Sequence, residues 1–185
     1  MHNSKTESFD LFTKDSCFTD DTVLTVAVCD ALLQHSDIKD GLFKNHEIAI
    51  TYAAKYKQYY SRYPHSGFGE MFKEWATSNS FQHQRSYGNG AAMRVAPIAY
   101  AFNDIKDVQK HARLSCSYTH NNKEAIIGAQ AVSSAVFLAK NRESKQNIKS
   151  YIEKVYKYNL SFKLNDIREK YVFDSRTNYS VPQQL

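Results

Sequence analysis

The chain of 185 residues is 42% hydrophobic and 23% charged, a composition typical of a soluble globular protein with one domain and a substantial core. No apolar run reaches the roughly 20 residues of a membrane-spanning helix, and the first residues lack the apolar core of a signal peptide. The net charge of +5 arises within residues 139–185, where lysines interleave with an apolar stripe, so we interpret the surplus as a solvated helix face and find no specific nucleic-acid signal.

The first half of the chain predicts three helices. A polar lead-in ends at residue 18, and the first helix runs from Asp20 to Leu33. Its apolar run has no polar face, so we expect this helix to be buried. Residues 45–60 form a second helix, because apolar and aromatic residues recur three and four apart. The loop over 62–69 is marked by proline and glycine, and a short helix over 70–75 follows.

The middle of the chain contains a second glycine-bearing loop, residues 87–90, which leads into a helix over 91–100. Pro97 either bends this helix or marks its true first turn. Asp104 is predicted to cap the next helix, whose apolar face extends to Cys116.

The last third predicts two further helices and an irregular end. Residues 125–139 are nearly all small or apolar and predict a close-packed central helix, whereas 143–156 is amphipathic. Residues 171–174 and 179–185 read as a loop and a proline-started helix of one turn, as if the domain were cut short. No segment alternates with period two, so the predicted fold class is all-α.

The three cysteines, Cys17, Cys29 and Cys116, are odd in number and have no Cys-x-x-Cys spacing. This usage is typical of reduced thiols in a reducing compartment. We therefore expect buried, unpaired cysteines and a cytoplasmic protein.

Two adjacent carboxylates stand at the start of the first predicted helix, within Phe18-Thr19-Asp20-Asp21-Thr22. One interpretation is helix capping, because acidic residues in a first turn face the positive end of the helix dipole. The other is a cation site in a cleft, because buried carboxylates are costly unless a cation or donors meet them. Oxygen ligands beside a hydroxyl suit Mg²⁺ or Mn²⁺ better than zinc. These residues alone leave both interpretations open.

Two more loops open helices and could bind a ligand: Tyr87-Gly88-Asn89-Gly90 and Thr119-His120-Asn121. Helix starts present free N–H groups, and glycine allows a backbone to approach a phosphate or sugar closely. His120 could hydrogen-bond a ribose or stack on a base, or it could be a structural residue. The glycine loop could equally be an ordinary turn.

Taken together, these stretches resemble the ADP-ribosylglycohydrolase family in residue type and order. The resemblance also includes Tyr63-Pro64, the run from Gly67 to Phe72, the Ala-Ala-Met-Arg-Val run that ends at Val95, and Gly128-Ala129-Gln130-Ala131. It covers roughly residues 9–185. It implies an all-α fold with two Mg²⁺ or Mn²⁺ ions, and cleavage of the bond that joins ADP-ribose to a protein side chain or a smaller acceptor.

The resemblance also implies roles for individual residues. Thr19, Asp20 and Asp21 are expected to be metal ligands, with Asp20 and Asp21 also serving as the catalytic carboxylates. The expected substrate-binding residues are Tyr87, Gly88, Asn89, Gly90 and His120.

The chain departs from the family pattern in its metal ligands. The family has a glutamate ahead of this region and an Asp-x-Asp-Thr motif beyond the Val-Pro-Gln region, and neither occurs in this sequence. Asp174-Ser175-Arg176-Thr177 is similar to that motif, but Arg176 would repel a cation. We therefore expect residues 1–185 to be a single, incomplete domain. It would be a hydrolase completed by a second copy or partner chain, or alternatively an inactive ADP-ribose-binding or structural remnant.

Overall fold

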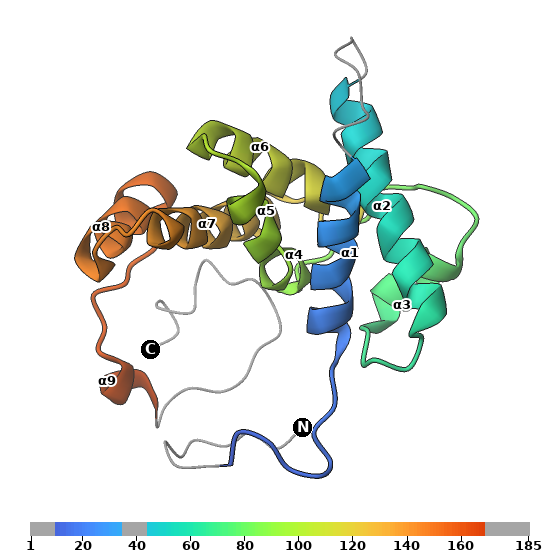
Figure 1. Cartoon of the computed structure of the whole chain (residues 1–185), viewed down its shortest axis with the longest axis horizontal. Coiled ribbons are helices and arrows are strands. Elements are labelled where there is room, and N and C mark those ends of the chain that lie inside the picture. Colours follow the sequence, from blue (N-terminus) through green and yellow to red (C-terminus); the bar gives the residue numbers. More distant parts are fainter. Residues whose placement is uncertain (1–9, 35–43, 169–185) are drawn as a thin grey trace.

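The computed structural model describes residues 10–34 and 44–168 (Figure 1), and this part of the chain is all-α. Its only β pairing is an isolated antiparallel bridge between Arg85 and His120. The described residues form nine helices: α1 (Asp20–Gln34), α2 (Lys44–Arg62), α3 (Glu70–Thr77), α4 (Gly90–Met93), α5 (Ala96–Ala101), α6 (Ile105–Cys116), α7 (Lys123–Lys140), α8 (Lys145–Tyr156) and α9 (Leu164–Arg168). The all-α prediction is confirmed.

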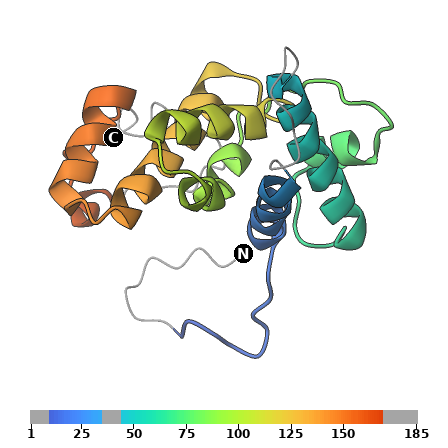
Figure 2. The ribbon, with the colours of Figure 1, turned by 45° about the horizontal axis from the view of Figure 1, so that its top comes forward.

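The helices pack as two groups that meet near α4 and α5. Helix α1 packs against α2, and α3 packs against α2 on the same side of the molecule (Figures 1 and 2). Helix α7 packs most extensively against α6 and also contacts α4, α5 and α8. Contacts of α1 with α4 and α5, and of α2 with α6, join the two groups.

Helix α7 has the central position that its small residues predict. Ala125, Gly128 and Ala129 are buried, and their short side chains allow α4, α5 and α6 to approach closely. The side chain of Asn122 accepts a hydrogen bond from the N–H of Ala125 and so caps the helix start.

Helix α1 is buried on one face only, so the prediction of a fully buried helix is wrong. Val23, Leu24, Ala27, Val28 and Ala31 are buried at helical spacing. The opposite face contains apolar side chains that remain accessible: Val26 is 44% exposed and Leu33 is 78% exposed. The sequence hides this two-faced helix because, beyond its first turn, the exposed residues of α1 carry no charge.

Pro97 separates α4 from α5. It lies in the first turn of α5, where its missing N–H costs no helical hydrogen bond, and α4 ends at Met93. The second alternative for Pro97 is therefore correct, with Arg94 and Val95 forming the junction.

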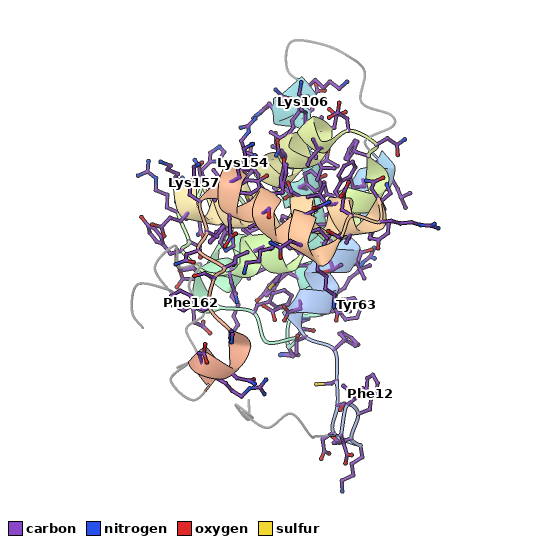
Figure 3. The ribbon with its side chains drawn as sticks, turned by 90° about the vertical axis from the view of Figure 1, so that its left-hand side faces the viewer. Phe12, Tyr63, Lys106, Lys154, Lys157 and Phe162 are labelled. Carbon is purple, nitrogen blue, oxygen red and sulfur yellow. The ribbon has the colours of Figure 1, made fainter. Side chains whose placement is uncertain are left out.

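The other helix boundaries agree with the predicted pattern. The Asp104 side chain accepts from the N–H of Lys106 at 2.7 Å, which confirms the predicted cap of α6. Helix α8 buries Ile152 and Tyr156 on one face, while Lys154 and Lys157 point into solvent (Figure 3). Helix α9 was not predicted, and residues 171–185 lie outside the described part of the chain.

All three cysteines are free, but only Cys116 is buried. Cys17 precedes α1, and Cys29 lies on the accessible face of that helix, so the expectation of buried thiols is wrong for both. No helix in the described ranges is long and apolar enough to cross a membrane.

Candidate functional site

The loop between α2 and α3 holds the start of α1. The backbone N–H of Asp20 donates to the carbonyl of Ser66 at 2.6 Å, and the ring of Phe18 meets that of Tyr63 edge-on at 5.6 Å. Gly67 follows with φ of +86°, a backbone conformation that favours glycine. A Cβ at Gly67 would lie 3.9 Å from Oδ1 of Asp20, so this loop also lines the carboxylate.

Asp20 and Asp21 occupy the first turn of α1 and differ in exposure. Asp20 is half-buried and Asp21 is exposed, and the Thr19 hydroxyl donates to Oδ2 of Asp21 at 3.1 Å. Burial raises the pKa of Asp20 and the negative charge of Asp21 raises it further, whereas the cation of Arg94 acts in the opposite direction. The pair therefore presents acceptor oxygens whose mutual repulsion a bound cation would relieve.

These three residues are the candidate metal ligands, and their chemistry fits Mg²⁺ or Mn²⁺ as part of a coordination sphere. Two carboxylates and one hydroxyl provide oxygen donors only, as hard divalent cations prefer. Within residues 10–34 and 44–168, however, no group of three or more His, Cys, Asp or Glu side chains could hold a metal ion. The described residues thus offer a partial donor set.

Arg94 is fully buried at the junction of α4 and α5. Its Nη2 donates to the Thr119 hydroxyl at 2.7 Å and reaches the carbonyl of Ser115 at 3.5 Å. The guanidinium carbon lies 4.1 Å from the ring centroid of Tyr56, a cation–π geometry. Its Nε and Nη1 have no hydrogen-bond partner in the described structure.

The glycine loop and His120 are in direct contact. Gly90 opens α4, and a Cβ placed on it would lie 3.1 Å from Cε1 and 3.2 Å from Nε2 of His120. The N–H of Gly88 bonds to the Ser86 hydroxyl at 3.2 Å, which shapes the turn. Asn89 is exposed, and Tyr87 is 55% exposed. The four predicted substrate-binding residues of this loop thus form a surface turn beside the imidazole.

Contacts with neighbouring residues hold both the backbone and the imidazole ring of His120. It pairs with Arg85 in the isolated bridge, and the Asn122 side chain donates to the carbonyl of Ser86 alongside. Its Nδ1 lies 2.8 Å from the Thr119 hydroxyl. The residue is 5% exposed, and burial, followed by the Arg94 cation, lowers the pKa of His120 to about 3. The ring is therefore neutral at physiological pH.

Arg94 is linked to two of the predicted segments, and the third, the glycine turn, contacts His120. Asp20 interacts electrostatically with this guanidinium, which hydrogen-bonds Thr119, and Thr119 in turn bonds to His120. Sequence reasoning did not assign a site role to Arg94. The sequence signal that could have indicated this role is a lone arginine in the otherwise apolar run before Pro97. Arginine is almost never fully buried unless its charge is paired.

Comparison with known proteins gives a consistent result. A family model described as ADP-ribosylglycohydrolase matches residues 5–180. The chain is similar to the ADP-ribosylhydrolase ARH3 of Bos taurus, with 34% identity over 146 residues that cover 71% of this chain and 38% of that protein. The Homo sapiens ADP-ribosylhydrolase ARH3 is 34% identical over 137 residues, which cover 69% of this chain and 36% of the relative. The chain thus spans well under half the length of the curated relatives that it matches.

Proposed function

The chain belongs to the ADP-ribosylglycohydrolase family, and from that membership we propose that it binds an ADP-ribosyl group and takes part in its metal-dependent hydrolysis. The observation that carries the proposal is that the Gly90 turn lies against His120, which is connected through Thr119 to the buried Arg94 guanidinium. The same cation also acts electrostatically on Asp20. The substrate class is an ADP-ribosylated protein or a small ADP-ribosyl compound.

In this proposal, Thr19, Asp20 and Asp21 hold Mg²⁺ or Mn²⁺ through oxygen atoms. When bound, such an ion supplies Lewis-acid chemistry that polarises substrate and water oxygens. The raised pKa of Asp20 supports the assignment, because burial and then the charge of Asp21 both disfavour its carboxylate unless a positive charge is present. Both carboxylates belong to the first turn of α1.

The protein groups then have distinct tasks. The backbone of Gly88, Asn89 and Gly90 would receive the ribose and phosphates, because no side chain at either glycine blocks a close approach. His120 would contact the ribose or adenine side. The bond from the anomeric carbon to the acceptor would break through an oxocarbenium-like state, and the acceptor would leave with the bonding pair and take a proton from water. A carboxylate oxygen of Asp20 or Asp21 would accept the proton of the water that attacks the anomeric carbon.

One observation favours a second candidate function, ADP-ribose binding without turnover. Among the described residues, two carboxylates and a hydroxyl hold a divalent ion weakly compared with a full ligand set. If turnover occurs, further ligands would come from a second copy or from a partner chain. A purely structural role is the remaining alternative, and it predicts no affinity for ADP-ribose.

Two measurements on the 185-residue chain separate these functions. Release of ADP-ribose from a modified protein in the presence of Mg²⁺ or Mn²⁺, lost on addition of a chelator, would support hydrolysis. Calorimetric titration with free ADP-ribose tests binding by itself. Binding without release favours the second function, and the absence of both supports a structural role.

A further inference from the structure

The hydrogen bonds around the Thr119 hydroxyl determine which nitrogen of His120 carries the proton. An arginine guanidinium can only donate, so in the 2.7 Å contact with Arg94 Nη2 the Thr119 oxygen is the acceptor. A hydroxyl has a single proton to give. Within the described structure, the remaining partner of Thr119 Oγ1 is Nδ1 of His120 at 2.8 Å. If the hydroxyl accepted from an Nδ1–H as well, its own proton would be buried without an acceptor among the described residues, which is costly. The hydroxyl therefore donates to Nδ1, which carries a lone pair and no proton.

The protonation state of the imidazole follows. His120 is buried beside a fully buried cation, so its charged form is disfavoured and the ring is neutral. A neutral imidazole has one N–H, and with Nδ1 occupied as an acceptor that N–H is at Nε2. No partner for Nε2 exists among the described residues, and the ring edge that bears it faces Gly90.

We propose that Arg94, acting through the Thr119 hydroxyl, fixes His120 as the neutral Nε2–H tautomer, so that the ring offers a hydrogen-bond donor to an oxygen of the ligand seated on the Gly88–Gly90 turn. Arg94 and Thr119 are then positioning residues. The same arrangement leaves His120 no lone pair for a metal ion, because Nδ1 is occupied and Nε2 carries the proton. The identity of the ligand as an ADP-ribosyl group rests on the proposed function, whereas the tautomer does not.

Packing holds both outer members of this series of contacts, Arg94 and His120, in place. Arg94 is held by the ring of Tyr56, whose hydroxyl donates to the carbonyl of Ser115 at 3.0 Å, so the guanidinium has little freedom to turn away. His120 is held by its backbone pairing with Arg85. Because both neighbours are fixed, the Thr119 hydroxyl has one orientation that satisfies them: it accepts from Arg94 and donates to His120.

The test compares Thr119→Val, which removes the hydroxyl at nearly constant shape, with Thr119→Ser, which keeps it. Nitrogen-15 spectra of the histidine rings report the tautomer directly, and His120→Gln identifies the resonances of this ring. We expect Nε2–H in the natural chain and in T119S, and a mixed population of tautomers in T119V. In calorimetry with ADP-ribose, T119V should bind about tenfold more weakly and T119S within about twofold of the natural chain.

A natural chain whose His120 carries its proton on Nδ1, or on both nitrogens at neutral pH, overturns the inference. So does a T119V chain that keeps the Nε2–H tautomer and full affinity. If T119V does not fold, the spectra of the natural chain and T119S still decide the tautomer. If the natural chain does not bind ADP-ribose, the proposed function and the ligand part of this inference both fail, while the spectra still decide the tautomer of His120 and the role of the Thr119 hydroxyl.

Discussion

The guanidinium of Arg94 lies 4.1 Å from the ring centroid of Tyr56, and the two side chains share the Ser115 carbonyl as an acceptor. This pair occupies the interior where α2, α6 and the junction of α4 and α5 meet. Burying a cation without a carboxylate partner is unfavourable unless other groups compensate. Here the compensation comes from an aromatic face, a hydroxyl and a carbonyl.

Arg94→Lys should therefore be strongly destabilising even though the charge is retained. A lysine ammonium cannot lie flat on the Tyr56 ring and reach Thr119 at the same time, because it lacks the planar fork of arginine. We expect a loss of about 2–3 kcal/mol in the free energy of unfolding, measured by urea denaturation. Arg113→Lys, on the exposed side of α6, is the matched control. Equal stability of both variants would contradict this account of the buried guanidinium.

Gly90→Ala should disturb His120, because the added Cβ would lie 3.1–3.2 Å from the imidazole ring. The ring has little room to move while Thr119 holds Nδ1, so we expect a cost of about 1–2 kcal/mol in stability and weaker ADP-ribose binding.

Gly69→Ala is the control for this substitution, since a Cβ there meets nothing within 4 Å and its backbone φ is −67°. Because Gly69 is the N-cap of α3 and alanine is a poor N-cap, G69A should cost about 0.5–1 kcal/mol in stability but leave ADP-ribose affinity unchanged. Unaltered ADP-ribose affinity in G90A would show that the turn and the imidazole are not coupled.

His120 should make the protein sensitive to acid. The pKa of the folded state, about 3, lies below the unfolded value of 6.5, so the unfolded chain takes up the proton first as the pH falls. The contribution to stability is therefore complete above pH 6.5 and is lost progressively down to about pH 3, with about 2 kcal/mol gone at pH 5.

His120→Gln should flatten the pH dependence of stability over that interval, as measured by thermal or urea unfolding at several pH values. His65→Asn, at an exposed position in the α2–α3 loop, should leave the dependence unchanged. An equally steep dependence in H120Q would place the acid-sensitive group elsewhere.

Replacing either candidate metal ligand in α1 should weaken cation binding. Asp20→Asn and Asp21→Asn each remove a charged oxygen donor, so we expect affinity for Mn²⁺ to fall by about tenfold or more. Electron paramagnetic resonance of free Mn²⁺ measures this binding without any requirement for turnover. Asp107→Asn, in the first turn of α6, is the control acidic residue. Equal Mn²⁺ affinity in all three variants would remove the assignment of the metal ligands.

The helices could be predicted largely from periodicity and local signals. The cap at Asp104 and the break at Pro97 are local chemistry, which the sequence displays directly. The burial of α1 was overestimated, because an outer face made of threonine, valine and cysteine looks apolar in sequence. Helix α9 is one short turn at the end of the described chain, too brief to leave a periodic signal.

The candidate site could be predicted only in part. The carboxylate pair and the glycine turn stand out by residue type, and the structure brings Gly90 and His120 together. What residue type could not reveal is that Arg94 connects them, because this requires the long-range packing of α4 against α7 and of α2 against α6. The roles of these residues in binding and catalysis stay predictions.

The proline that divides α4 from α5 has a wider effect than ending a helix. Arg94 lies at the junction between α4 and α5, and the glycine turn leads directly into α4. Any change in the angle between these two helices would therefore move the buried guanidinium and the glycine turn together. Insertions or deletions at this joint should therefore be far less tolerated than changes of similar size in the exposed stretch before Phe81.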